Sequence, residues 1–391
     1  MRAFDAIVVG AGPAGSLAAY HLAAAGASVV LLDRERFPRD KPCGGGVTGR
    51  ARRELPFSID PVVEQLTLRV DLRLRSGRPV ERGGQRMLAA MTQRRRLDNF
   101  LAGKAADAGA DFRDGVKVTS VESDGRAVAV TAGGERLRGA ALVGADGVNG
   151  VTARALTLGG NRAVGVALEG NVANERCDAE RYRGRFLLEF GTVPGGYAWV
   201  FPKGEHLNVG VGGWEHEGPR LRAHLAAFCA RQGIAPNDLE ALRGFRLPLR
   251  APDSRLARGR ALVAGDAAGL IDPLTGDGMF EAFLSGRFAA ESIRRMLAGE
   301  EESVEPYGTR LTRHLAAHLW AAWTLKAALD RFPRTAFTVA THWPVWPVVE
   351  KLVTGELADV SAVHGIARPV LKSLAYLARA AGDPGRAYRV A

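Results

Sequence analysis

Two uninterrupted apolar runs open the chain, over residues 6–9 and 29–32, and a stretch rich in Ala and Leu separates them. Short apolar runs without alternation are typical of strands that are buried on both faces of a parallel sheet. The residues after Gly15 favour a helix, because Ala and Leu have high helix propensity. The pattern therefore predicts a strand, a helix and a second, parallel strand.

Elsewhere apolar and polar positions alternate, which is typical of strands with one face in the core and one in solvent. This alternation covers residues 62–90 and returns as short strands from about residue 160 to 215. A helix is expected over residues 219–233. We interpret these segments as the antiparallel sheet of a second domain.

The segments between these strands return to the first domain. They predict a helix that starts at residue 94 and ends at Gly109, a hairpin-like pair over 116–121 and 127–130, a strand over 137–143, and a strand over 260–264 that leads into a helix through Ser292.

Residues from 306 onward favour helices that are interrupted by prolines, namely Pro333, Pro344, Pro347, Pro369 and Pro384. Four of the six tryptophans lie in this region, at positions 320, 323, 343 and 346. Burial in a core is the preferred interpretation for them, ahead of contact with a membrane interface.

The patterns together predict an α/β fold with two interleaved domains. A Rossmann-type nucleotide-binding domain would take residues 1–60, 92–160 and 255–300. An antiparallel β-sheet domain that binds the substrate would take residues 61–91 and 161–254, and a C-terminal helical region would take residues 301–391.

The glycines between the first strand and the first helix have the spacing Gly10-x-Gly12-x-x-Gly15, and Asp33 ends the second strand. Gly10 permits a tight turn, Gly12 lets the backbone approach a pyrophosphate, and Gly15 lets the helix pack closely on the strand. The free N–H groups and the positive dipole end of the helix suit phosphates. Asp33 is placed to accept a hydrogen bond from a ribose hydroxyl, so this unit predicts a dinucleotide site.

Composition narrows the class of protein. The 391 residues are 47% hydrophobic and 24% charged, as in an ordinary globular enzyme. The net charge of +11 suits phosphates, an acidic electron-donor protein or an anionic membrane surface. Because the arginines are spread along the chain, a dispersed solvated surface is the preferred interpretation. Because the chain has no zinc-ligand spacing and no basic reading helix or tail, we expect no metal and no nucleic-acid partner.

The expected location is cytoplasmic. Three scattered cysteines argue against a disulfide framework and favour a reducing compartment. The first strand begins within a few residues of Met1, and no apolar run approaches the length of a spanning helix. Peripheral contact with the inner face of the membrane is left open, as is the oligomeric state.

Two stretches carry candidate chemistry with two interpretations each. The loop after the second strand is rich in Gly and Pro and contains Cys43, which is either a small turn residue or a thiol beside a cofactor. Tyr197, Trp199 and Phe201 alternate and so share one face of a strand. They form either part of a sheet core or an aromatic wall for an apolar ligand.

Two helix starts also attract attention. Three arginines at positions 94–96 oppose the helix dipole, so at least one is expected to have a specific anionic partner. Gly276 and Gly278 precede a later helix and offer a second set of free N–H groups.

Taken in order, these motifs resemble those of the flavoprotein-hydroxylase superfamily, whose fold is that of p-hydroxybenzoate hydroxylase, and most of all those of the geranylgeranyl reductase family. The resemblance covers residues 5 to about 295. Asn149-Gly150 stands where the superfamily often has Asn-Ser, and Asp277 stands where Gly or Glu is common. The motifs are Gly10-x-Gly12-x-x-Gly15, Lys41-Pro-Cys43-Gly, Arg94-x-x-Leu-Asp98, Asp146-Gly147, Tyr197-x-Trp199-x-Phe201-Pro202, and Gly265-Asp-Ala-Ala-Gly269 continuing to Pro273-Leu-Thr-Gly276-Asp-Gly278.

The resemblance implies FAD in a Rossmann-type FAD-binding domain, with the isoalloxazine near Gly44 and Gly45. It places a helix N-terminus at Met279, where the dipole would stabilise the anionic reduced flavin. It assigns Tyr197, Trp199, Phe201 and Pro202 to the prenyl pocket. The residues it assigns to FAD are Gly10, Gly12, Pro13, Ala14, Gly15, Asp33, Arg34, Cys43, Gly44, Gly45, Arg94, Val118, Asp146, Gly265, Asp266, Gly276, Gly278 and Met279.

The implied activity is FAD-dependent saturation of double bonds in an isoprenoid, geranylgeranyl-type chain, by hydride transfer from flavin N5. Cys43, Tyr197 or a water would supply the proton. The sequence contains one strand–glycine–helix nucleotide unit, so the electron donor would be NADPH without a Rossmann domain of its own, or reduced ferredoxin.

Two alternatives use the same fold. One is an FAD-dependent monooxygenase or halogenase that acts on a specialised metabolite. Halogenases typically carry Trp-x-Trp-x-Ile-Pro where this chain has Tyr197-x-Trp199-x-Phe201-Pro202, and hydroxylases tend to place an arginine one residue before Arg154. The other is a non-catalytic prenyl-lipid carrier, which the complete set of flavin motifs disfavours.

Overall fold

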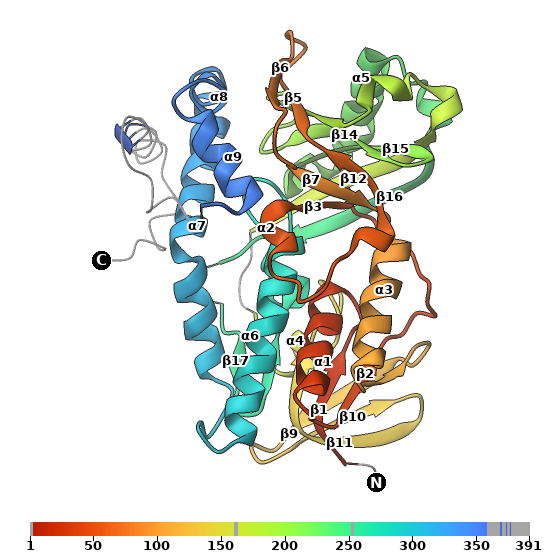
Figure 1. Ribbon diagram of the computed structural model, residues 1–391, viewed down its shortest axis with the longest axis vertical. Helices are drawn as coiled ribbons and strands as arrows, with labels where there is room; N and C mark the ends of the chain where they lie inside the picture. The colour runs from red at the N-terminus through yellow and green to blue at the C-terminus, as the bar shows by residue number, and fades with distance from the viewer. Residues whose placement is uncertain are drawn as a thin grey trace.

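The computed structural model describes residues 3–159, 163–251 and 254–357, together with positions 368, 369, 373 and 376. Apart from those four positions, the predicted helical region beyond residue 357, with Pro384, lies outside the described residues. Two large β-sheets stand one above the other, and long helices run beside them (Figure 1).

The lower sheet is built on the predicted strand–helix–strand unit. Its first strand, β1 (Ala3–Val9), pairs in parallel with β2 (Val29–Leu32) on one side and with β11 (Glu135–Gly144) on the other. All four residues of β2 are buried, as expected for a strand covered on both faces. The other strands of this sheet are β8 (Asp111–Arg113), β9 (Val118–Ser123), β10 (Val128–Ala132), β17 (Ala257–Arg258) and β18 (Ala261–Val263).

Three helices cover the lower sheet: α1 (Pro13–Ala24), α3 (Arg94–Asp107) and α6 (Met279–Leu297). Small residues let α1 and α6 cross closely. A Cβ atom added at Gly286 of α6 would lie 2.4 Å from the carbonyl oxygen of Ala14 in α1. The segment after residue 260 therefore completes the core that the first residues of the chain begin.

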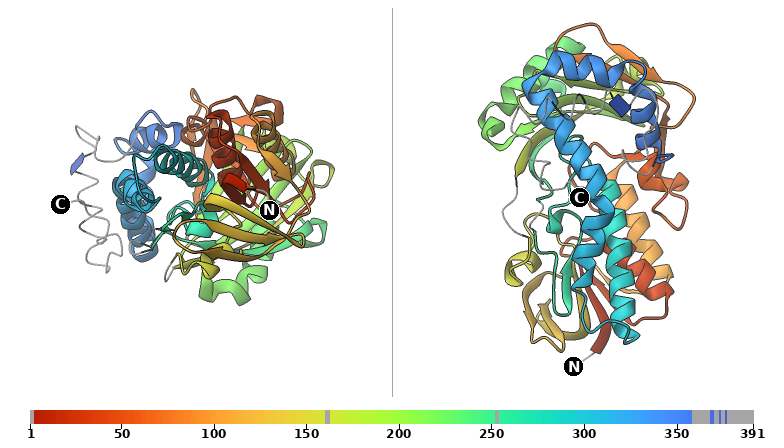
Figure 2. Two further views of the ribbon diagram at one scale, coloured as in Figure 1. Left: turned by 90° about the horizontal axis from the view of Figure 1, so that it is seen from below. Right: turned by 90° about the vertical axis from the view of Figure 1, so that its left-hand side faces the viewer.

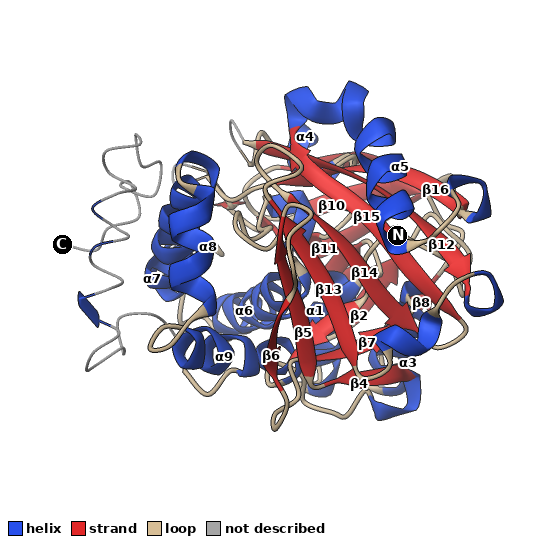
Figure 3. Ribbon diagram, turned by 90° about the horizontal axis from the view of Figure 1, so that it is seen from above, coloured by secondary structure: helices blue, strands red, loops and turns tan. Residues whose placement is uncertain are grey.

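The upper sheet has seven strands in the order β16-β12-β15-β14-β13-β5-β6. It is antiparallel except for one pair, since β13 and β5 run parallel, which the alternation pattern did not predict. Helix α5 (Leu221–Gln232) covers β12 and β15 (Figure 3). The strands are β5 (Arg69–Leu74), β6 (Val80–Gly83), β12 (Val164–Ala173), β13 (Arg185–Phe190), β14 (Tyr197–Lys203), β15 (His206–Trp214) and β16 (Glu240–Pro248).

A small third sheet lies between the two large ones and corrects the prediction for residues 62–90. Strands β4 (Val63–Thr67) and β7 (Ala89–Thr92) pair with β3 (Gly46–Thr48) instead of joining β5 and β6 in the upper sheet. Alternation identified these residues as strands, but it carries no information about which strand is the partner. The short helix α2 (Gly49–Arg52) follows β3.

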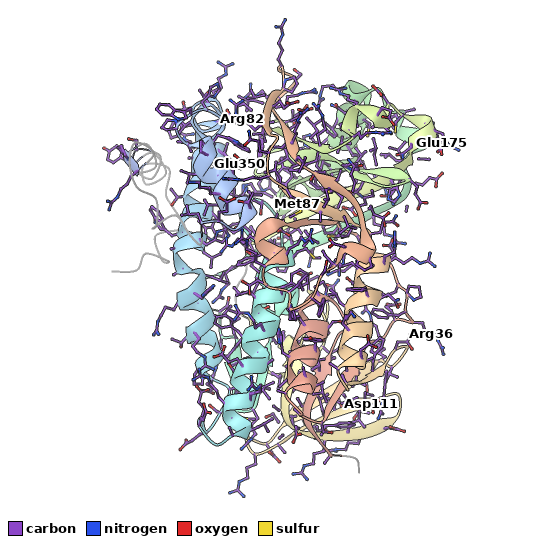
Figure 4. All side chains as sticks on the ribbon, in the orientation of Figure 1. Arg36, Arg82, Met87, Asp111, Glu175 and Glu350 are labelled. Atoms are coloured by element: carbon purple, nitrogen blue, oxygen red, sulfur yellow. The ribbon has the colours of Figure 1, made fainter. Side chains whose placement is uncertain are left out.

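The C-terminal helices connect the two halves. Helix α7 (Pro306–Arg331) runs beside α6 and continues upward beyond it, and α8 (Pro333–Thr341) and α9 (Trp346–Thr354) lie beside the upper sheet (Figure 2). Arg82 of β6, labelled at the top of Figure 4, donates its Nε–H to the Thr341 carbonyl of α8 at 2.5 Å. Trp323 is buried, but Trp343 is 73% exposed, so the core interpretation is wrong for Trp343.

None of the helices in the described ranges combines the length and the apolar character that a membrane-spanning helix requires.

Candidate active site

One cavity of about 940 Å³ lies between the lower sheet and the upper sheet. This volume is near the upper end of the usual range for small-molecule sites. Its wall includes the aromatic positions Tyr197, Trp199 and Phe201 of β14. The other sequence-predicted residues that line it are Gly10, Gly12, Pro13, Ala14, Asp33, Arg34, Cys43, Gly44, Gly45, Arg94, Val118, Asp146, Gly265, Asp266, Gly276, Gly278 and Met279.

Two predicted site residues do not line this cavity. A Cβ atom at Gly15 would lie 1.8 Å from the Gly10 carbonyl oxygen, so Gly15 serves the packing of α1 against the end of β1. Pro202 follows Phe201 on β14 and points to the opposite face of the sheet, because successive side chains of a strand alternate. Its assignment to the prenyl pocket therefore has no support in the geometry.

The start of α1 presents an open anion site. Gly12 is the N-cap residue, no side chain caps the helix, and no acidic residue occupies its first turn. A Cβ atom at Gly12 would have Arg39 Nη2 at 3.7 Å and Arg94 Nη2 at 4.0 Å as its nearest neighbours. Free N–H groups and two guanidinium groups therefore face the same space, which suits a pyrophosphate.

Arg94 is the arginine with the specific anionic partner that the sequence predicted. Its Nε and Nη2 donate to Oδ1 and Oδ2 of Asp98, each at 2.7 Å, and Arg39 Nη1 lies 2.6 Å from Oδ2. Asp98 is completely buried. Burial opposes its ionisation, but the Arg94 and Arg39 guanidinium groups overcome this and hold the pKa of Asp98 below its ordinary value. Arg39 was not assigned to the site from the sequence.

Asp33 and Asp146 reach the cavity but also hold backbone turns. Ala11 donates its N–H to Asp33 Oδ2 at 2.7 Å, which ties the end of β2 to the glycine-rich turn. Val151 and Thr152 donate their N–H groups to Asp146 Oδ2 at 2.7 and 3.0 Å. The Asp146 carboxylate thus stabilises the turn that precedes α4 (Thr152–Ala155).

Two buried side chains of opposite charge from the upper sheet hold the backbone of Cys43 on both sides. Glu169 of β12 accepts the Cys43 N–H at 2.6 Å, and Lys203 of β14 donates to the Cys43 carbonyl at 2.6 Å. Burial raises the pKa of Glu169, with Lys203 opposing the shift, and burial lowers the pKa of Lys203. The adjacent Gly44 leaves room for the Phe201 ring, which would lie 2.5 Å from an added Cβ atom.

The aromatic residues of β14 form a continuous wall. The ring centroids of Tyr197 and Trp199 are 5.9 Å apart, and those of Trp199 and Phe201 are 6.1 Å apart. Phe186 of β13 extends the wall, with its centroid 5.6 Å from that of Phe201. The Tyr197 hydroxyl donates to the Thr275 carbonyl and so connects the wall to the loop before α6.

Helix α7 contributes a cavity residue that the resemblance could not predict, because it weakened beyond residue 305. Lys326 lines the cavity, donates to the Gly195 carbonyl and places its Nζ 4.3 Å from the centroid of the Trp214 ring. Burial lowers the pKa of Lys326, although Asp330 opposes the shift. The cavity thus has a cationic group near the Tyr197 end of its aromatic wall.

These features fit FAD. The uncapped start of α1, bare Gly12 and paired guanidinium groups suit the pyrophosphate. Asp33 lies within the same cavity at the end of β2, and the start of α6 lies there at Gly278 and Met279. Glycines at 44 and 45 keep side chains away from the adjoining space. The fold and this site define an FAD-dependent oxidoreductase.

Comparisons with known proteins agree with this class. Residues 5–182 match the family model described as lycopene cyclase protein, and residues 166–239 match that of the geranylgeranyl reductase catalytic domain. The chain is 31% identical to menaquinone reductase of Mycolicibacterium smegmatis, over 93% of this chain and 94% of that protein. It is 32% identical to geranylgeranyl diphosphate reductase of Rhodobacter capsulatus, over 79% of each chain.

A solved structure supports the fold independently. The geranylgeranyl bacteriochlorophyll reductase-like protein of Thermoplasma acidophilum superimposes with a TM-score of 0.82 at 22% identity, covering 96% of this chain and 100% of that one. The chain belongs to the geranylgeranyl reductase family of FAD-dependent oxidoreductases.

Proposed function

We propose that this enzyme saturates carbon–carbon double bonds in an isoprenoid chain. The observation that carries the proposal is the aromatic wall of Tyr197, Trp199 and Phe201, which lines the same cavity as the cofactor-binding glycines. Aromatic rings offer a large apolar contact area to a flat, methyl-branched alkene. The named relatives, a menaquinone reductase and a geranylgeranyl diphosphate reductase, also point to prenyl substrates.

Reduced FAD would supply a hydride equivalent to one carbon of the double bond. The protein binds the cofactor and the isoprenoid chain and fixes their relative position. Arg94, Arg39 and the start of α1 bind the pyrophosphate, and the aromatic wall orients the chain and excludes water. The Glu169–Lys203 pair fixes Cys43 and Gly44 against Phe201. The electrons would come from transiently bound NADPH or from reduced ferredoxin.

Cys43 and Tyr197 are the side chains that the sequence indicates as sources of the proton. Tyr197 is poorly suited to this role. Its hydroxyl is engaged with the Thr275 carbonyl, and burial, together with the charges of Asp277 and Asp272, raises the pKa of its phenol. We therefore assign Tyr197 to positioning the wall against the loop. Cys43 contacts the reacting end of the isoprenoid in this proposal.

Anaerobic reoxidation tests the function. The FAD-loaded protein would be reduced and mixed without oxygen with geranylgeranyl diphosphate or a menaquinone. We expect the flavin absorbance to return and the product to gain two hydrogens per saturated bond. A flavin that stays reduced until oxygen enters would instead favour the monooxygenase or halogenase alternative. Supplying NADPH or reduced ferredoxin to the oxidised enzyme identifies the donor.

Replacing Cys43 with Ala or Tyr197 with Phe is expected to lower alkene turnover by about ten-fold, since each change loosens the geometry at the reacting end of the chain. FAD should remain bound in both variants. Turnover is measured at saturating substrate, and bound FAD is measured by its absorbance. Cys177→Ala, a change at a partly buried thiol outside the cavity lining, is the matched control. Unchanged turnover in both variants would show that neither Cys43 nor Tyr197 takes part in the reaction.

A further inference from the structure

Asp277 lies in the loop directly before α6 and lines the same cavity as Cys43 and Tyr197. One of its carboxyl oxygens, Oδ1, accepts the Met279 N–H at 2.8 Å. The Gly278 N–H also interacts with this carboxylate. The sequence marked this position only as a departure from the family pattern. In the structure it is a partly buried acid at the start of α6 that lines the cavity.

The groups packed around Asp277 come from four elements. Asp272 lies in the same loop, Glu281 is in the first turn of α6, Arg50 comes from α2, and Tyr197 comes from β14. Asp272 and Glu281 are 3% and 2% exposed, so their charges are poorly screened by solvent. Three carboxyl groups, those of Asp272, Asp277 and Glu281, thus lie near Arg50.

Asp272 is the carboxylate of this group that keeps its charge. It accepts the Leu274 N–H at 3.0 Å and the N–H and hydroxyl of Thr275 at 2.7 and 2.8 Å. His318 of α7 faces its other oxygen, with Nε2 2.9 Å from Oδ2. Arg50 Nη1 lies 2.8 Å from His318 Nδ1, and because a guanidinium only donates, the ring hydrogen must be on Nε2. His318 Nε2 also lies 3.7 Å from Glu281 Oε1, so Asp272, Glu281 and His318 form one compact cluster.

The same surroundings determine the state of Asp277. Burial raises the pKa of Asp277 to about 6; the Met279 N–H and Arg50 oppose the shift, and the charge of Asp272 adds to it. Glu281 is affected more strongly, and burial raises its pKa well above the ordinary value. Asp277 is therefore an acid that holds its proton at mildly acidic pH and can release it near neutrality.

We propose that Asp277 donates the proton that completes saturation of the double bond; this inference rests on the proposed function. The carboxyl O–H bond breaks as a C–H bond forms at one alkene carbon. The π bond is consumed, and the other carbon takes the hydride equivalent that the reduced cofactor supplies. The carboxylate that remains regains a proton from water that enters the cavity after product release.

The test compares Asp277→Asn with wild type in anaerobic single turnovers of the reduced holoenzyme with geranylgeranyl diphosphate. Asparagine keeps the acceptor for Met279 but has no acidic proton. We expect a 10²- to 10⁴-fold slower alkene reduction. In wild type the rate should fall about ten-fold per pH unit above about pH 6, because the protonated form is the active one. Asp277→Glu should restore much of the rate.

Infrared difference spectroscopy of the oxidised holoenzyme, without substrate, gives a second measurement. The carbonyl band of a protonated carboxyl group should disappear with a midpoint near pH 6 in wild type and be absent in Asp277→Asn. Glu281→Gln, the same change at a carboxyl that does not line the cavity, is the matched control and should leave this titration in place.

The outcomes separate the two hypotheses. If wild type reduces the isoprenoid but Asp277→Asn does so at a similar rate and with the same pH profile, the role of Asp277 is wrong and the proposed function stands. If wild type reduces no prenyl substrate while the infrared band titrates normally, the proposed function fails and the proton transfer fails with it.

Discussion

Replacing Arg94 with alanine is expected to yield a protein that is strongly destabilised and does not retain FAD. Arg94 is 4% exposed and binds both oxygens of the fully buried Asp98. Removing one partner of a buried ion pair typically costs about 3–5 kcal/mol, and here only Arg39 would remain beside the Asp98 carboxylate. The same change removes a guanidinium from the open space beside Gly12. Denaturant unfolding and flavin absorbance after gel filtration measure the two effects.

Arg95→Ala is the matched control, because Arg95 is the next residue of the same helix and its side chain is exposed. It should be nearly neutral. Since the pKa of Asp98 is lowered in the folded state, the stability that the pair provides is present above the unfolded pKa of aspartate. It is lost as the pH falls through the lower folded value. The difference between the two variants should therefore be full at neutral pH and shrink in acid. Equal stability and equal FAD content would contradict the assigned role.

Gly15→Ala is expected to have an effect of similar size on FAD retention. The added methyl group would lie 1.8 Å from the Gly10 carbonyl oxygen and 3.1 Å from Ala145 Cβ, and a backbone atom has little freedom to retreat. The start of α1 would have to move away from β1, which takes its N–H groups out of line with the pyrophosphate. Thermal unfolding and the bound FAD content of the purified protein report the change.

Gly103→Ala serves as its control. This glycine is also within a helix, α3, but an added Cβ atom meets nothing within 4 Å. Alanine there should stabilise the protein by about 0.5–1 kcal/mol, because glycine is a poor helix former. A Gly15→Ala protein that binds FAD as tightly as Gly103→Ala would show that close packing at this turn is not required.

The first strand–helix–strand unit was predictable because its signals are local. The strand predicted at residues 6–9 lies in β1, the helix expected after Gly15 begins slightly earlier as α1, and the strand predicted over 27–33 contains β2. The spacing of the three glycines is contained in six residues. Which sheet each strand within residues 62–90 joins was not predictable. Alternation identifies which face of a strand is buried, whereas β4 and β7 were assigned to their small sheet by packing between distant segments.

The candidate site was likewise predictable only where its signals are local in the sequence. Motif positions located the aromatic wall and most of the cavity lining, since a motif keeps its members close in sequence. Glu169 and Lys203 were missed because they are 126 and 160 residues from Cys43 along the chain. The raised pKa of Asp277 depends on its burial and on the charges of Asp272 and Arg50, and the spacing of motifs in the sequence does not reveal these.

The crossing of α1 and α6 has a consequence for how the protein is made. Strand β1 and helix α1 are synthesised well before α6, yet α1 packs against Gly286 of α6, and β11 gains β18 only after residue 261 has been added. Domains of many proteins fold as units while synthesis continues. Here the first core stays incomplete until α6 has been synthesised. The face of α1 that packs on α6 lacks its partner until then, and chaperone protection of the nascent chain should matter more for this enzyme than for a contiguous Rossmann domain.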